Sequence, residues 1–305
     1  MNDRARTWMR RIALGLPLVA FPLTTGFSAC GPCPEEVTTL RSGGDGGVSL
    51  ITDGGVNRSC DEICREELTD LSSLTSCRFV GVGDQDVECT YTPYCPGGRR
   101  PEGLALRAAD RSNEVGAWLA ELAAVEAASV PAFAQLGREL TAHAAPRALI
   151  ERSAAAARDE VRHARRVAWL ADRYDAPPAT AAHAATPTRL LEAVAMDNAV
   201  EGCAREAFGA LLAARQAAAA HDPAVAFVFG GIARDEARHA LLSFAVADWA
   251  SGRLNARARR RIAEARRAEL ASLARGYEAD PSAAVAEALG LPDAERAQDL
   301  AAALA

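Results

Sequence analysis

Lysine is absent from this chain of 305 residues, so every strongly basic side chain is an arginine. Together with the abundance of alanine, this absence is explained more simply by a GC-rich genome than by a function. The formal net charge is −6, and no stripe of arginines is free of acidic neighbours. Nucleic-acid binding depends on clustered positive charge that neutralises phosphates. The composition therefore argues against a nucleic-acid partner.

The apolar stretch near the N-terminus, residues 12–21, is too short and too interrupted by proline to span a bilayer comfortably. It follows four arginines, which is the pattern of a secretory signal. It leads to Phe-Ser-Ala-Cys at residues 27–30, which resembles a bacterial lipobox, although leucine is usual in place of Phe27. We therefore expect residues 1–29 to be a lipoprotein signal and Cys30 to be lipidated, which anchors the protein at a membrane of the bacterial cell envelope. A plain secreted protein is the alternative.

No two C-x-x-C motifs pair in the cysteine-rich part of the chain, which argues against a metal site there. An even number of cysteines in an exported segment most simply forms disulfides, here three of them. The cysteines expected to pair are Cys33, Cys60, Cys64, Cys77, Cys89 and Cys95. Cys203, which lies far from this group, is expected to be a buried free thiol.

Four segments of different composition follow the predicted signal. Residues 30–58 are rich in Gly, Asp, Thr and Pro and predict a flexible tether. Residues 59–98 form the cysteine-rich segment, in which an alternating pattern indicates a small hairpin. Residues 113–252 then show helical periodicity, and residues 253–305 predict a helical extension. Caps and prolines divide the helical region into expected helices at about 113–142, 146–174, 188–220 and 222–252.

The octapeptide Ala-Arg-Asp-Glu-x-Arg-His-Ala occurs twice in the helical region. In each copy a glutamate and a histidine stand three residues apart, so that both lie on one face of an α-helix. A carboxylate and an imidazole placed in this way can share one metal ion. The two pairs are Glu160 with His163 and Glu236 with His239.

A further glutamate precedes each copy by about one helical hairpin. Glu126 lies 34 residues before Glu160, and Glu201 lies 35 residues before Glu236. A single Glu-x-x-His occurs by chance on many helices, but two copies with matching upstream glutamates are much harder to obtain by accident. Four carboxylates and two histidines are the ligands of a di-iron or di-manganese site in a four-helix bundle.

These two modules resemble the ferritin-like di-metal carboxylate superfamily, which includes rubrerythrins, di-iron monooxygenases and manganese catalases. The resemblance covers residues 113–252 and implies an all-α fold. That fold is a ferritin-like four-helix bundle with a long crossover, residues 175–187, between helices two and three. The small disulfide-rich segment would precede it. The chain lacks the rubredoxin-type iron site of standard rubrerythrins.

The resemblance also implies roles for the repeated residues. Glu126, Glu160 and His163 would hold one metal. Glu201, Glu236 and His239 would hold the other, with Glu160 and Glu236 bridging the two.

The Asp-Glu-x-Arg-His form is typical of the di-iron monooxygenase and desaturase branches. It implies that Asp159 and Asp235 each accept a hydrogen bond from a ligand histidine of the other helix, and that Arg162 and Arg238 pair with these aspartates. The alternative is that these four residues are surface charges.

Glu206 is an ambiguous position. It aligns with Pro131 of the first module and lies five residues after Glu201, which points it about 140° away on a regular α-helix. A π-bulge would turn it toward the metals as an additional ligand. Otherwise it is a polar position beside the site.

Oxygen and nitrogen ligands suit iron(II), manganese(II) and, less selectively, zinc(II). The resemblance implies two iron ions that react with dioxygen or peroxide, in a ferroxidase, a peroxide scavenger or a substrate oxidase. No catalytic residue is separable from the ligands, and no tyrosine lies within a turn of them, which disfavours a radical site. No electron-donor module is evident, so the alternative is a non-catalytic envelope protein that sequesters metal. A structural bundle with a vestigial site is a third hypothesis.

Overall fold

The structure is a computed structural model in which the chain divides into two compact units, Cys33–Cys95 and the rest, formed by Met1–Pro32 with Pro96–Ala305. The predicted lipidation site, Cys30, lies outside the described residues, as do Cys33, Cys64 and Cys95 and the side chain of Cys89. The described residues are 3–16, 37–42, 59–60, 72–80, 86–93, 99–101, 105–107, 113–176, 178–182, 187–275 and 282–305.

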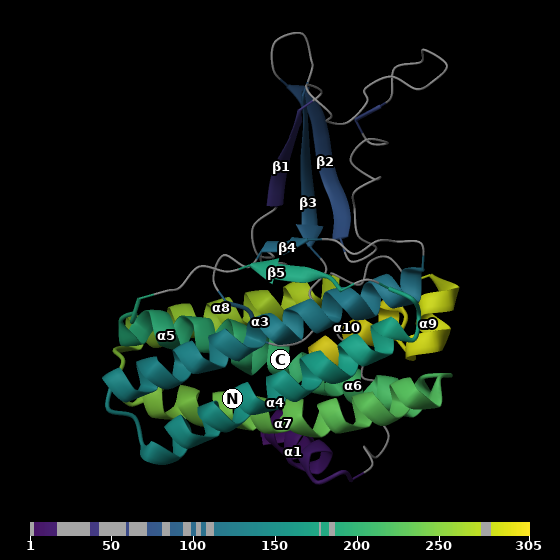
Figure 1. The fold of residues 1–305 in the computed structure, drawn as a ribbon. Coiled ribbons are helices and arrows are strands. Elements are labelled where there is room, and N and C mark those ends of the chain that lie inside the picture. Colours follow the sequence, from purple (N-terminus) through teal and green to yellow (C-terminus); the bar gives the residue numbers. More distant parts are fainter. Residues whose placement is uncertain are drawn as a thin grey trace, which may run out of the picture. The chain divides into compact units, whose positions relative to one another are not determined.

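The smaller unit contains a three-stranded antiparallel sheet. Its strands are β1 (Val37–Ser42), β2 (Ser72–Val80) and β3 (Asp86–Pro93), with β3 in the centre (Figure 1). Strands β2 and β3 form the expected hairpin, but β1 lies within the segment predicted to be a tether. Its Val-Thr-Thr-Leu sequence favours an extended conformation and pairs with β3. Cys60 and Cys77 form a disulfide with their Cα atoms 5.8 Å apart.

The larger unit is mostly helical. Helix α3 (Glu114–Ala142) starts at Asn113, whose side-chain oxygen accepts a hydrogen bond from the backbone N–H of Gly116. Helix α4 (Arg147–Asp172) starts after Pro146 and packs along α3. Both helices lie within a few residues of the expected ranges.

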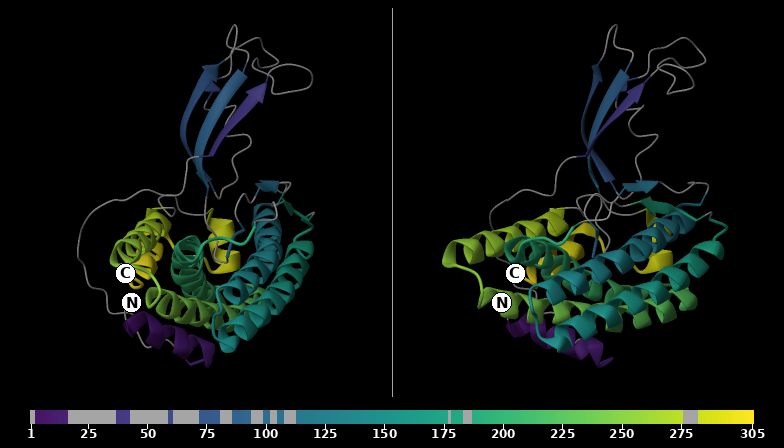
Figure 2. Two further views of the ribbon diagram at one scale, coloured as in Figure 1. Left: turned by 90° about the vertical axis from the view of Figure 1, so that its left-hand side faces the viewer. Right: turned by 60° about the vertical axis from the view of Figure 1, so that its left-hand side comes forward.

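The third expected helix is continuous but not uniform. It consists of α5 (Leu191–Asp197), the π-helix η1 (Asn198–Glu206) and α6 (Ala207–Ala219). Helix α7 (Pro223–Ser251) follows, with Asp222 as its N-cap and proline in its first turn, as expected. We call α3, α4, α5–η1–α6 and α7 the central helices. Both α4 and the α5–η1–α6 helix contact α7, and the views in Figure 2 show the central helices around a common interior.

Other elements cover the central helices. Helix α1 (Asp3–Ala13), which lies in the predicted signal, packs on α7 with Met9 buried and Arg6 paired to Asp248 at 2.7 Å. Strand β5 (Thr180–Ala182) lies in the predicted crossover and pairs with β4 (Ala105–Arg107). The helices that follow α7 are α8 (Ala256–Arg275), α9 (Ala283–Leu289) and α10 (Ala294–Ala302).

Among the described residues, α3 alone is long and apolar enough to meet the length and composition of a membrane span. However, 78% of that apolar window is buried inside the structure, as is usual for a core helix. The described residues are mostly helical. The predicted all-α class was incomplete, because the smaller unit contains a three-stranded sheet.

Candidate metal centre

Six buried side chains from the central helices converge in the interior of the larger unit. Each is at most 4% exposed. Their ligand atoms form two groups, and within each group the atoms lie within 4.8 Å of one another. The first group is Glu126, Glu160, His163 and Glu236, and the second is Glu160, Glu206, Glu236 and His239. Each group therefore has its own histidine and its own glutamate, and the two groups share Glu160 and Glu236.

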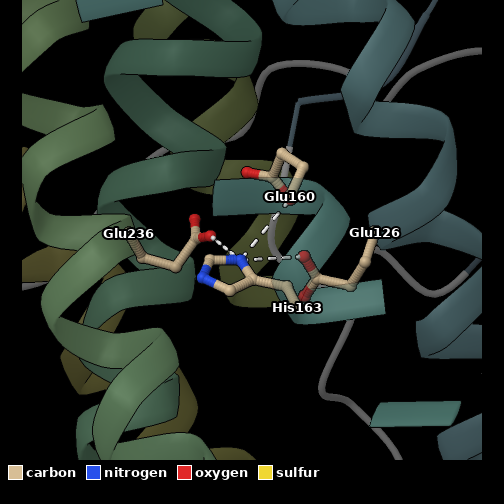
Figure 3. A group of neighbouring side chains, drawn as sticks. All are labelled: Glu126, Glu160, His163 and Glu236. Atoms are coloured by element: carbon tan, nitrogen blue, oxygen red, sulfur yellow. Dashed lines mark ion pairs between the residues drawn. The ribbon is translucent and has the colours of Figure 1, made fainter. Parts of the chain in front are cut away.

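In the first group, the Nδ1 atom of His163 faces three carboxylates (Figure 3). It lies 3.3 Å from Glu126 Oε2, 3.5 Å from Glu160 Oε2 and 3.4 Å from Glu236 Oε1. Helices α3, α4 and α7 supply these residues. A nitrogen lone pair and several carboxylate oxygens thus point to one small volume.

The second group repeats this arrangement. The Nδ1 atom of His239 lies 3.1 Å from Glu160 Oε1, 3.2 Å from Glu206 Oε2 and 3.5 Å from Glu236 Oε1. Here the glutamate that is not shared comes from η1. The two imidazole rings lie 5.9 Å apart between centroids, so that the groups are adjacent.

Most of the converging atoms lack a hydrogen-bond partner. This holds for both carboxylate oxygens of Glu160, Glu206 and Glu236 and for Nδ1 of both histidines. Buried polar atoms normally have partners, and a dense group of carboxylate and imidazole atoms without partners calls for cations. Four carboxylates would balance the four positive charges of two divalent ions, which makes their burial tolerable. The residues fit a pair of divalent metal ions with oxygen and nitrogen ligands.

The pKa values differ between the unshared glutamates, Glu126 and Glu206, and the two shared glutamates. Burial, together with repulsion from Glu160, raises the pKa of Glu126 well above its usual value. Burial and Glu236 do the same to the pKa of Glu206. For Glu160 and Glu236 burial also raises the pKa, but the two imidazoles outweigh it and lower the pKa. Without metal, the unshared glutamates therefore retain protons to higher pH than the shared ones.

The far nitrogen of each histidine contacts an aspartate of the other repeat. His163 Nε2 lies 3.1 Å from Asp235 Oδ2, and His239 Nε2 lies 3.3 Å from Asp159 Oδ2. An N–H at Nε2 leaves the Nδ1 lone pair directed at the carboxylate group, which is the tautomer that a metal ligand requires. The aspartates thus orient the imidazoles.

Two arginines complete a charged network between α4 and α7. Arg162 pairs with Asp159 on its own helix and lies 3.5 Å from Asp235 on the other. Arg238 likewise pairs with Asp235 and lies 4.0 Å from Asp159. The arginines are about half exposed, whereas the aspartates are mostly buried. Because the aspartates contact both the arginines and the histidines, these four residues are not isolated surface charges.

The structure corrects one member of the expected ligand set. Glu201 lies in neither group. Its Oε2 atom accepts a hydrogen bond of 2.9 Å from the backbone N–H of Arg100, and its Oε1 atom lies 3.4 Å from Arg205. Glu206, the position that the sequence left ambiguous, contacts His239 instead.

The π-helix is the physical reason for this exchange. Its hydrogen bonds join residues five apart, which widens the turn and changes the direction of every later side chain relative to an α-helix. Glu206, the last residue of η1, is thereby directed at the cluster. The sequence held one signal of this. The spacing from Glu201 to Glu236 exceeds that from Glu126 to Glu160 by one residue, as an inserted residue in the third helix would produce.

Comparisons of the chain with protein-family models, with curated proteins and with solved structures find no match. The assignment of the site therefore depends on its own chemistry.

Proposed function

We propose that this protein binds two divalent metal ions in a ferritin-like four-helix bundle formed by the central helices. Iron is the first candidate for both ions. We further propose that the protein is an oxidoreductase acting with dioxygen or peroxide. The observation that carries the proposal is the sharing of Glu160 and Glu236 between two groups that each add one glutamate and one histidine. Two bridging carboxylates are what hold a pair of ions close together.

The chain's own residues would perform three tasks. Glu126 with His163, and Glu206 with His239, would each bind one ion, while Asp235 and Asp159 hold the imidazoles in the required tautomer. The burial of all six ligands excludes bulk water from the site. An iron pair held in this way supplies redox chemistry toward dioxygen or peroxide.

A second candidate is metal sequestration without turnover. The observation that favours it is the burial of every ligand, with Glu160, His163 and Glu206 fully inaccessible to solvent. A closed site suits retention of an ion better than repeated entry of a substrate. The ligands would be the same in both functions, so kinetics must separate them.

Anaerobic titration with iron(II), followed by exposure to dioxygen or to peroxide, tests the proposal. We expect two ions per chain. Rapid oxidation that repeats over many cycles supports the oxidoreductase, whereas tight binding with one slow oxidation supports sequestration. A chain that binds fewer than two equivalents of iron, manganese or zinc would refute the di-metal site. The double variant Glu126→Gln/Glu206→Gln is the control, since it keeps side-chain size but removes both unshared carboxylates.

We also propose that the protein is exported and anchored at the cell envelope through lipidated Cys30. The support is the arginine-rich and apolar N-terminus that leads to the lipobox-like residues 27–30. Mass spectrometry of the mature N-terminus tests this. A diacylated Cys30 is expected, and a chain that still begins before residue 30 would contradict it.

A further inference from the structure

Arg99 is a buried arginine outside the metal cluster. Only 1% of it is exposed, and it belongs to the short described segment 99–101 that precedes the central helices. Its Nη1 atom donates a hydrogen bond of 2.8 Å to Asp197 Oδ2, and its Nη2 atom donates one of 3.0 Å to Asn198 Oδ1. Arginines are almost never fully buried unless they are paired. The guanidinium thus joins the last residue of α5 to the first residue of η1.

The position is tightly shaped around this guanidinium. A Cβ atom added to Gly202, in the middle of η1, would lie 2.6 Å from Arg99 Nη2 and 2.2 Å from Ser243 Oγ on α7. Asn198 Nδ2 also donates a hydrogen bond of 2.9 Å to the backbone oxygen of Ser243. The missing side chain at Gly202 therefore leaves the space that Arg99 occupies between η1 and α7.

Arg99 is also linked to the cluster through one aromatic ring. Its guanidinium carbon lies 5.4 Å from the centroid of the Phe133 ring, a distance at which a cation is attracted to the ring. The Phe133 ring in turn meets the His239 ring edge-on, with the centroids 4.9 Å apart. The arginine thus contacts both the start of η1 and the residue that packs on a candidate ligand.

We propose that Arg99 is a positioning residue for the second group of ligands, an inference that rests on the proposed di-metal function. A π-helix is a rare conformation that occurs mostly as a local bulge within an α-helix. Without the contacts at its first residue, we expect η1 to adopt the hydrogen bonding of an α-helix. In η1 the first residue, Asn198, is held by Arg99, and the last residue, Glu206, carries a ligand. Reversion would turn Glu206 away from His239, while Glu126 and His163, on α3 and α4, would stay in place.

Arg99→Ala should therefore weaken the binding of one metal ion selectively, the ion held by Glu206 and His239. The expected loss is about ten- to a hundred-fold in the affinity for the weaker ion, as for other residues that orient ligands. The other ion keeps its affinity. A merely structural role would lower both affinities together. Arg99→Lys keeps the charge but lacks the planar guanidinium that hydrogen-bonds both Asp197 and Asn198. It should therefore not restore the affinity for the ion held by Glu206 and His239.

Cys203 provides a second readout that needs no metal. It lies in η1, it is buried, and its sulfur is 3.7 Å from Asn198 Nδ2. Alkylation of Cys203 in the metal-free protein can be followed by mass spectrometry of its tryptic peptide, residues 190–205. We expect the rate to rise about ten-fold or more in Arg99→Ala, because η1 is no longer held. Arg147→Ala is the control, since it removes the same charge from an exposed arginine at the start of α4.

Asp197→Asn guards against a variant that does not fold. It keeps the size of the side chain but removes the charge that pairs with the Arg99 guanidinium, and it should give the same selective loss and faster alkylation to a smaller extent. Equal alkylation rates in parent, Arg99→Ala and Asp197→Asn, or an equal loss of both ions, overturn the inference. If the parent binds no metal pair, the proposed function fails, yet the alkylation rates still decide whether Arg99 holds η1.

Discussion

The Oε2 atom of Glu206 lies 3.2 Å from Nδ1 of His239, although the sequence repeat assigned that neighbourhood to Glu201. The contact exists because η1 is a π-helix, and it gives the two candidate metal positions equivalent ligands.

Substitution at these two glutamates should therefore have opposite outcomes. Glu206→Gln removes an unshared carboxylate and should weaken one ion by more than the roughly ten- to hundred-fold typical of residues outside the ligand set. Glu201→Gln should leave two ions bound. Metal content by elemental analysis, combined with titration of the apoprotein, measures both. Two tightly bound ions in Glu206→Gln, or one in Glu201→Gln, would restore the ligand set expected from the repeat.

The shared glutamates should be more critical than the unshared ones. Glu160 and Glu236 each belong to both groups, so Glu160→Ala or Glu236→Ala should weaken both ions. Glu126→Ala should weaken only one, because it belongs to the first group. The separate affinities for the first and the second equivalent of metal distinguish the two patterns. Loss of a single ion in Glu160→Ala would show that this carboxylate does not bridge.

The aspartates should act through the histidines that they contact. Asp235→Asn should lower the affinity of the ion held by His163, and Asp159→Asn that of the ion held by His239, each by about ten- to a hundred-fold. Each asparagine keeps the size of the side chain but loses the charge that favours the correct tautomer. Asp248→Asn, which changes an exposed carboxylate outside both groups, is the control. Affinities equal to those of the control would mean that the aspartates do not orient the imidazoles.

Much of the helical architecture was predictable because its signals are local. Asn113 and Asp222 are N-caps whose side chains accept backbone hydrogen bonds, and they start α3 and α7 where the sequence indicated. The octapeptide likewise placed Glu160 and Glu236 one turn before their histidines, because a three-residue spacing on a helix leaves little freedom.

The exchange of Glu201 for Glu206 was not predictable in this way. It depends on the π-helix, and the contacts that hold it come from distant residues, such as Arg99 on Asn198 and Ser243 on Asn198. Periodicity within the third helix carries no information about these partners. The pairing of β1 with β3 is another long-range effect. Composition alone predicted a tether for the segment that contains β1.

The disulfide between Cys60 and Cys77 should stabilise the smaller unit without affecting the site. It closes a loop of sequence separation 17, for which the chain-entropy contribution is about 3 kcal/mol. The variant Cys60→Ser/Cys77→Ser should therefore exchange amide hydrogens faster in peptides of residues 33–95. Metal stoichiometry should not change, because all six converging ligands belong to the other unit. A loss of metal in this variant would show that the two units depend on each other.

The stability of the metal-free protein should decrease as the pH rises above the ordinary carboxyl and imidazole values of about 4.3 and 6.5. Burial raises the pKa of Glu126 and Glu206, and nearby carboxylates raise the pKa of His163 and His239 despite burial. Groups with a raised pKa contribute stability that is complete below the unfolded value and is lost as the pH passes the folded value.

The groups with a lowered pKa, such as Glu160 and Glu236, do not oppose this trend. Their contribution is present above the ordinary carboxyl value and is lost only at lower pH. Bound metal replaces the protons of the ligands, so the metal-loaded protein should lack the decline, and metal binding should release protons. Melting temperatures from about pH 5 to pH 8, with metal and with a chelator, measure the difference, which should widen as pH rises. A gap that is constant or narrows with pH would mean that the protons and the metal do not compete for these six side chains.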